Sequence, residues 1–201
     1  MNITLSGEEV ELIPLAAGHA EELASAAGES REHYGLAVVP DGVDEARAYI
    51  RAAIANRSRY AFVIRFIGRV VGTTSYLDMQ TWKWPSGSPL QRSGEADVLE
   101  IGSTWLAESA QRTRCNTECK YLLLEYAFET WKVHRVTLKT DARNSRSRRA
   151  IERIGASFEG IRRAERPATD GTIRDSAYYS IILSEWPAVK ASLQAKLARN
   201  V

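Results

Sequence analysis

The sequence has little of several features that would place it in a special class of protein. Its 201 residues include only two cysteines and three histidines, too few in the right places for a zinc set. No apolar run approaches the roughly 20 residues of a membrane span. The first residues lack the basic region and apolar core of a signal peptide. We therefore expect a cytoplasmic protein with no membrane partner and no metal.

Strong charge of one sign is also missing. The formal net charge is +2, with 44% hydrophobic and 26% charged residues, as in ordinary globular proteins. This balance does not indicate a nucleic-acid partner, although arginines cluster between residues 143 and 149. There is no internal repeat, linker or low-complexity tract, and the length suits one domain over residues 1–201.

The two cysteines, Cys115 and Cys119, fall near the start of one expected helix. Thiol pKa values tend to fall at helix N-termini, which would permit a redox or nucleophilic role. The alternative is that Cys119 is a small core residue and Cys115 a turn residue.

The first half of the chain reads as strand, two helices and a hairpin. The expected elements are a strand at 10–15, a helix at 16–27, a helix capped by Asp44, and paired strands at 60–66 and 70–77. The second helix has one apolar face, which predicts core packing: Val43, Ala46, Ile50, Ala53 and Ile54.

A long polar loop is expected over residues 79–94, with several prolines and glycines. It carries Trp82 and Trp84. Aromatic side chains on a long loop fit a substrate wall or a dimer contact, and they equally fit a segment that folds back over the core.

The middle of the chain predicts a crossover unit. A strand at 97–106 leads through a polar turn into a helix that ends near residues 131–132, and a further strand contains Val136 and Leu138. Such a strand–helix–strand unit makes its two strands parallel. The helix has one buried stripe at helical spacing: Cys119, Leu122, Leu123, Tyr126 and Ala127.

The last part predicts a short helix, a hairpin and a final helix. Asn144 or Ser145 can cap the short helix, and Gly155 ends it. Ser147 shares the face of Ile151 and Ile154, so it should point toward the sheet. Strands at 157–161 and 173–183 flank an Asp-Gly turn at 170–171, and a helix follows to residue 197.

Four segments in this order resemble the GNAT superfamily of N-acetyltransferases, most closely its RimJ/RimL-like branch. They are EIGSTWL, QRTRCN, YAFETWKVHRVTLKTDARNSRSRRAIERIGA and RDSAYYSIILSEWP, within residues 97–187. The resemblance implies an α/β (α+β) fold with a mixed, mostly antiparallel sheet and helices on both faces. It also implies a central parallel strand pair that splays apart.

In this superfamily acyl-CoA lies between the splayed strands, so the resemblance implies that acetyl-CoA binds here. The pantetheine arm would run beside residues 104–107, and the pyrophosphate would meet backbone N–H groups of the turn at 111–116. The implied binding residues are Thr104, Trp105, Leu106, Gln111, Arg112, Thr113, Arg114, Cys115, Asn116, Thr117, Asn144 and Ser147.

The turn departs from the family pattern at Arg114, where a glycine is expected, and at Asn116, where a small residue is expected. Glycine permits unusual φ and a close backbone approach. Either Arg114 adopts a helical conformation and adds its charge to the anion site, or its side chain crowds the turn.

The resemblance also implies catalytic residues. Ser147 matches a serine that would hydrogen-bond the CoA sulfur and protonate the leaving thiolate, since Ile151 stands where relatives have a tyrosine. The alternative for Ser147 is a serine bonded to a backbone carbonyl. Glu100 is the candidate base, and the alternative is that it is a purely structural carboxylate. Lesser candidates for the base are Asp78, Glu159 and Tyr179. No partner is evident for His19, His33 or His134.

The predicted function is acetyl transfer from acetyl-CoA to a primary amine, either a protein N-terminus or a small molecule. The alternative is a non-catalytic acyl-CoA-binding or interaction module on the same fold. A homodimer fits either case. The arginines at 143, 146, 148 and 149 would meet the 3′-phosphate of CoA or simply form a solvated helix face.

Overall fold

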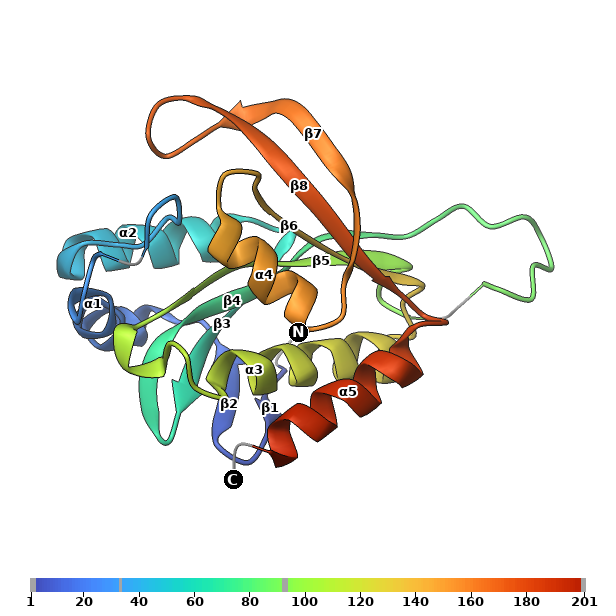
Figure 1. The fold of residues 1–201 in the computed structure, drawn as a ribbon, viewed down its shortest axis with the longest axis horizontal. Coiled ribbons are helices and arrows are strands. Elements are labelled where there is room, and N and C mark those ends of the chain that lie inside the picture. The colour runs from blue at the N-terminus through green and yellow to red at the C-terminus, as the bar shows by residue number, and fades with distance from the viewer. Residues whose placement is uncertain (1–2, 33, 92–93, 200–201) are drawn as a thin grey trace.

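The frame of the molecule is an eight-stranded sheet with the strand order β1-β2-β3-β4-β5-β6-β8-β7 (Figure 1). The computed structural model describes residues 3–32, 34–91 and 94–199. The strands are β1 (Leu5–Ser6), β2 (Val10–Pro14), β3 (Arg59–Phe66), β4 (Arg69–Gln80), β5 (Val98–Leu106), β6 (Arg135–Asp141), β7 (Ser157–Pro167) and β8 (Ile173–Ile182).

Six of the seven strand pairings are antiparallel, and β5 with β6 is the parallel pair. The mixed, mostly antiparallel sheet predicted from the sequence is therefore confirmed. β7 is longer than expected, because a bulge at Ala164 lets it keep its pairing with β8 as far as Pro167. The turn between them includes Gly171 at φ 79°, as an Asp-Gly hairpin requires.

The helices are α1 (Ala20–Gly28), α2 (Gly42–Ala55), α3 (Cys115–Glu125), α4 (Ser145–Arg153) and α5 (Trp186–Ala198), with a π-helical turn (Tyr126–Thr130) after α3. The expected cap at Asp44 is wrong, since α2 begins at Gly42 and Asp44 lies in its first turn. Ala46, Ile50 and Ala53 are buried as predicted, but Ile54 is 56% exposed. It lies at the edge of the apolar stripe, where α2 turns to solvent.

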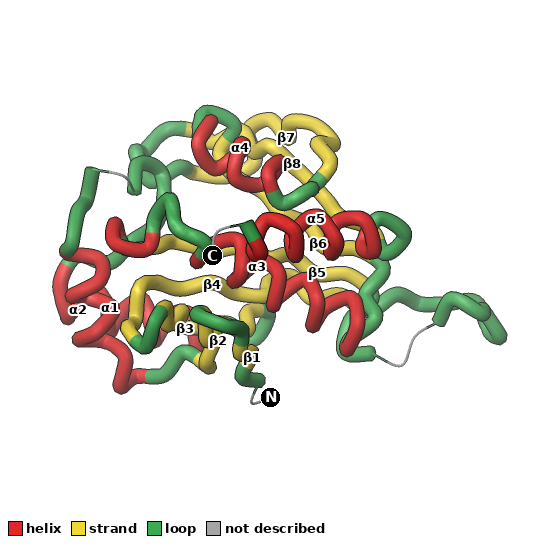
Figure 2. The backbone as a smooth tube through the Cα atoms, turned by 60° about the horizontal axis from the view of Figure 1, so that its bottom comes forward, coloured by secondary structure: helices red, strands yellow, loops and turns green. Residues whose placement is uncertain are grey.

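Helices cover both faces of the sheet, and alternate residues of β4 show which helix lies on which face. On one face Tyr49 of α2 hydrogen-bonds Thr73 at 2.8 Å. On the other face, the Tyr76 hydroxyl donates to the Leu123 carbonyl of α3 at 2.7 Å. α4 and α5 lie on the same face as α3 (Figure 2). The α1–α2 pair packs on β3 and β4 on its face.

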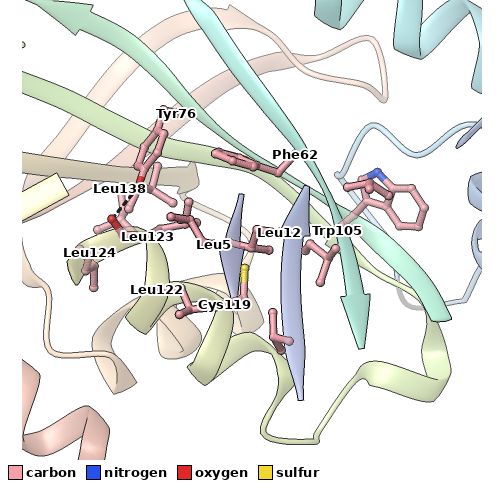
Figure 3. Close-up of a cluster of buried hydrophobic side chains, with 14 of the residues drawn as sticks. Leu5, Leu12, Phe62, Tyr76, Trp105, Cys119, Leu122, Leu123, Leu124 and Leu138 are labelled. Atoms are coloured by element: carbon pink, nitrogen blue, oxygen red, sulfur yellow. Dashed lines mark hydrogen bonds between the residues drawn. The ribbon is translucent and has the colours of Figure 1, made fainter. Parts of the chain in front are cut away.

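The core forms where α3 packs on the sheet (Figure 3). Phe62 and Tyr76 are fully buried there, with ring centroids 5.7 Å apart in an edge-on arrangement. Leu123 and Cys119 of the predicted stripe are also fully buried. Each large apolar side chain removed from water contributes about 1.5–3 kcal/mol to folding, so this packing holds α3 firmly against the strands. In the described part of the chain, every helix is too short or too polar to cross a membrane.

Candidate active site

The parallel strands β5 and β6 pair over only three residues, from Val98–Arg135 to Glu100–Thr137. Beyond this point each strand continues without the other, β5 to Leu106 and β6 to Asp141. Ser103 helps to turn β5 aside, since it lies in a bulge opposite β4 with φ 47°. The divergence opens a cleft of about 1560 Å³ between the strands. The splayed pair predicted from the sequence is therefore confirmed.

Most of the predicted site residues meet in this cleft although they come from four segments of chain. The cleft is lined by Glu100, Thr104, Trp105, Leu106, Gln111, Arg112, Thr113, Arg114, Asn116, Asn144 and Ser147. Cys115 and Thr117 are buried behind the turn and do not line it. These two positions can contribute to the site only through the backbone of the turn.

The turn before α3 is held by its own side chains. The Thr113 hydroxyl accepts a hydrogen bond from the Cys115 N–H at 3.1 Å and donates to the Ala110 carbonyl at 2.8 Å. Arg112 has φ 60°, a conformation that favours glycine. α3 begins at Cys115, between Arg114 and Asn116, which both line the cleft. A helix start presents unpaired N–H groups and a positive dipole end, which suits an anion.

Gln111 ties this turn to both walls of the cleft. Its amide nitrogen donates to the Leu106 carbonyl at 2.8 Å, and its oxygen accepts from Arg146 of α4. The turn, the end of β5 and the start of α4 are thereby linked across the cleft. This link places the turn before α3 and Arg146 at the same end of the cleft.

Arg114 is helical, with φ −68° and ψ −16°, as the first of the two alternatives required. Its charge, however, is directed away from the turn. The guanidinium lies 2.5 Å from the Glu8 carboxylate and 3.5 Å from Glu118, and its side chain is only 9% exposed. Glu118 is buried too and accepts from the backbone N–H groups of Glu8 and Glu9. Arg114 therefore joins α3 to the segment before β2, and its charge is engaged by carboxylates of that segment and of α3.

The start of α4 forms the second wall. The Asn144 side chain accepts from the Ser147 N–H at 2.9 Å, so Asn144 is the helix cap, as predicted. Within the described residues, no group hydrogen-bonds the Ser147 hydroxyl, although Ser147 is half-buried and lines the cleft. The alternative of a serine bonded to a backbone carbonyl is therefore not observed.

The arginines at 143, 146, 148 and 149, before and on α4, divide into two groups. Arg143 bonds Asp141 and Asp170, and Arg148 donates to the Tyr179 hydroxyl at 2.9 Å. Arg146 and Arg149 instead line the cleft. The cluster is thus neither wholly a solvated face nor wholly a cleft wall, and residues 146 and 149 are the ones placed to meet a ligand.

Glu100 lies on the opposite face of the sheet from α3, beside the point where the strands part. Its carboxylate is 2.9 Å from the Lys139 ammonium and only 7% exposed. Burial raises the pKa of Glu100 above its ordinary value, and Lys139 opposes that shift. Asp78 and Glu165 approach Lys139 at 3.7 and 3.9 Å. Glu100 is therefore a buried carboxylate at the cleft whose proton affinity is increased, which suits a general base.

The lesser candidates for the base are placed differently. Glu159 is bound to Arg135, and neither it nor Tyr179 lines the cleft. The Tyr179 hydroxyl is held between Arg148 and Glu152 at 2.9 Å from each. Asp78 does line the cleft, but its side chain is 59% exposed, so its solvation is more ordinary.

The sequence patterns did not indicate that Lys120 belongs to the cleft. Lys120 on α3 is buried, and its ammonium donates to the Thr104 hydroxyl at 2.6 Å and to that of Thr74 at 3.3 Å. Burial lowers its pKa. No ion pair to Lys120 occurs among the described residues. A lysine inside an otherwise apolar helical stripe was the available signal, but spacing alone does not show what it faces.

The tryptophan loop lies away from the cleft and extends from the body at one side (Figure 1). Trp82 N–H and the Trp84 indole both donate to Asp97, at 2.6 and 2.9 Å. Trp82 also stacks on His134 with ring centroids 5.6 Å apart. His134 thus has partners that the sequence did not reveal, while His19 accepts from the Ala16 N–H at 3.1 Å. His33 lies outside the described residues. This arrangement does not support the loop as a wall of the cleft.

The two cysteines are free and buried. Burial raises the pKa of the Cys119 thiol to about 11 and raises that of Cys115 further. Both thiols therefore stay protonated near neutral pH, so desolvation outweighs the helix N-terminus. The core interpretation is favoured over a nucleophilic role.

Comparison with known proteins agrees with this geometry. The family described as "Acetyltransferase (GNAT) domain" matches residues 9–157. The chain is 34% identical over 91 residues to "Putative ribosomal N-acetyltransferase YdaF" of Bacillus subtilis, a match over 45% of this chain and 49% of that protein. The aligned part thus spans about half the length of that curated relative.

Solved structures match over nearly the whole chain. A GCN5-related N-acetyltransferase from Brucella melitensis superposes with a TM-score of 0.82 and 28% identity, covering 97% of this chain and 85% of that one. RimL, a ribosomal L7/L12 alpha-N-protein acetyltransferase in complex with coenzyme A, gives a TM-score of 0.70 at 16% identity, covering 90% and 98%. The second likeness concerns the fold alone.

Proposed function

The chain belongs to the acetyltransferase (GNAT) family, and on that premise we propose that it moves the acetyl group of acetyl-CoA to a primary amine. The observation that carries this proposal is the cleft between β5 and β6. It joins an anion-binding turn on one face of the sheet to the buried Glu100 carboxylate on the other. Donor and acceptor can therefore meet from opposite faces.

Acetyl-CoA is proposed to bind on the α3–α4 face. Its pyrophosphate meets the N–H groups at the start of α3, and its 3′-phosphate meets Arg149. The pantetheine arm follows β5 from Thr104 to Leu106, where β6 no longer supplies a pairing strand. The chain would bind this substrate mainly through its backbone, which explains how Arg114 and Asn116 can replace smaller residues in the turn.

The reaction is direct. The amine nitrogen attacks the thioester carbon, the carbon–sulfur bond breaks, and the sulfur leaves as a thiolate that takes up a proton. Glu100 accepts the proton that the amine loses, directly or through water, and Ser147 supplies a proton or hydrogen bond to the sulfur. A backbone N–H near residues 105–106 polarises the thioester carbonyl. Two observations support these roles: the Ser147 hydroxyl has no hydrogen-bond partner among the described residues, and burial raises the pKa of Glu100.

The test is thiol release from acetyl-CoA by the purified chain with amino acids, peptides, polyamines and aminoglycosides as acceptors. Release above the rate without acceptor, together with the acetylated amine by mass spectrometry, supports the proposal. Calorimetric binding of CoA without turnover on any amine would instead favour a non-catalytic acyl-CoA-binding module. Failure to bind CoA would overturn both.

A further inference from the structure

Arg166 of β7 and Arg174 of β8 are directly opposite each other in the antiparallel pair, and both line the cleft. Like charges in this position repel and destabilise a sheet. The bulge at Ala164 creates the arrangement, because it shifts the register of β7 between Arg162 and Arg166. The Ala164 N–H is anchored to Asp175 at 2.7 Å, so the bulge is held in place.

Neighbouring basic residues form ion pairs, whereas carboxylates act on Arg174 only from beyond ion-pair distance. Arg162 lies 3.9 Å from Glu165, and Arg143 lies 2.9 Å from Asp170 on the same hairpin. In the described part of the chain, neither Arg166 nor Arg174 forms an ion pair. Arg174 is half-buried, and its side chain donates a hydrogen bond from Nε to the Ser176 hydroxyl at 2.8 Å. Burial and the charge of Arg166 both lower the pKa of Arg174.

This pair of arginines is electrostatically coupled to Glu100. Arg166 lowers the pKa of Glu100, and Glu100 raises that of Arg174. All three side chains line one cleft. An acceptor bound in this cleft can therefore contact the Glu100 carboxylate with one group and the two guanidinium groups with another.

We infer that Arg166 and Arg174 bind an anionic group, a carboxylate or a phosphate, carried by the acceptor amine. The inference rests on the proposed function and deepens it by naming the acceptor class. Guanidinium groups match both anions in geometry, and the anion relieves the repulsion between the two arginines. Polyamines and aminoglycosides bring only positive charge and are disfavoured.

The experiment compares acceptors matched in their amine. One pair is a dipeptide with a free carboxylate and the same dipeptide as its amide; the other is phosphoethanolamine and ethanolamine. The charged member of at least one pair should have a kcat/KM at least tenfold higher, and the two pairs distinguish carboxylate from phosphate. Arg166→Gln and Arg174→Gln should each raise KM for that acceptor at least fivefold without changing the affinity for CoA.

Arg163→Gln is the matched control, since Arg163 is exposed on β7 and does not line the cleft. Equal kcat/KM for charged and neutral partners, or no effect of the two arginine variants beyond that of the control, overturns the inference while acetyl transfer stands. If no amine is acetylated, calorimetry with the CoA-saturated protein decides. Charged ligands that bind tighter than their neutral partners, and only with both arginines present, support the anion site; equal or absent binding overturns it.

Discussion

The Lys120 ammonium donates to the Thr104 hydroxyl at 2.6 Å and so joins the middle of α3 to β5 where β5 leaves β6. Thr74 of β4 completes the group, with its hydroxyl 2.8 Å from that of Thr104. A lysine buried without a carboxylate is costly to keep charged. The contact therefore links two elements of the cleft wall, and the free energy needed to keep the buried lysine charged makes its contribution to stability depend on pH.

Replacing Lys120 by Met should flatten the pH dependence of stability. The pKa of Lys120 in the folded protein is lowered from its ordinary 10.5. At pH values between the lowered pKa and 10.5, the unfolded chain therefore binds more protons than the folded one. Stability of the wild type then rises with pH in that window, by up to about 1.4 kcal/mol per pH unit. Urea unfolding at several pH values measures it, with Lys83→Met in the exposed loop as control. Parallel profiles for wild type and Lys120→Met would contradict the prediction.

Replacing Glu100 by Gln should lower kcat about 100-fold or more, because the amine loses its base. The base works as a carboxylate, so activity rises with pH through its pKa, which burial places above the ordinary 4.5. That acidic limb should be present in the pH–rate profile of the wild type and absent in the variant. Glu159→Gln, outside the cleft, should keep the profile; an unchanged limb in Glu100→Gln would remove Glu100 from the mechanism.

Replacing Ser147 by Ala should reduce kcat about tenfold or more while leaving the dissociation constant of CoA within about twofold. The reason is that the hydroxyl acts on the leaving sulfur, whereas the Ser147 N–H that meets Asn144 is retained. Steady-state kinetics and calorimetry separate the two effects. Ser145→Ala, on the exposed start of α4, is the control, and equal turnover in Ser147→Ala would exclude the role.

Replacing Arg114 by Gly, the residue expected from the family pattern, should destabilise the protein by about 3 kcal/mol. The change leaves Glu118 buried without its cation. Arg112→Gly is the comparison, since the φ of 60° at Arg112 already suits glycine. That change should alter the free energy of unfolding by less than about 1 kcal/mol. Denaturant unfolding of both variants tests this, and equal midpoints would show that the Arg114 ion pairs contribute nothing.

Local patterns predicted much of the fold. The apolar stripe through Cys119 and Leu123 indicated the packing of α3, and the Asp-Gly turn at 170–171 indicated the β7–β8 hairpin. The order of strand, helix and strand predicted the parallel β5–β6 pair. The start of α2 was predicted wrongly at Asp44, because a favourable cap residue does not by itself fix a helix start, and α2 begins at Gly42. The segments lining the cleft were predicted on another ground, the resemblance of four segments to the GNAT superfamily, and not from these local patterns.

Periodicity and turn residues act over a few neighbours in the chain, so they were enough to predict the elements and their order, and the family resemblance added the cleft. The partners of the charged side chains became visible only in the folded molecule. Lys120 meets hydroxyls 46 and 16 residues away, and Arg114 meets a carboxylate 106 residues away. Arg166 faces Arg174 because of a bulge. Such partners depend on which strands and helices become neighbours, and electrostatic interactions depend on burial, which no local pattern specifies.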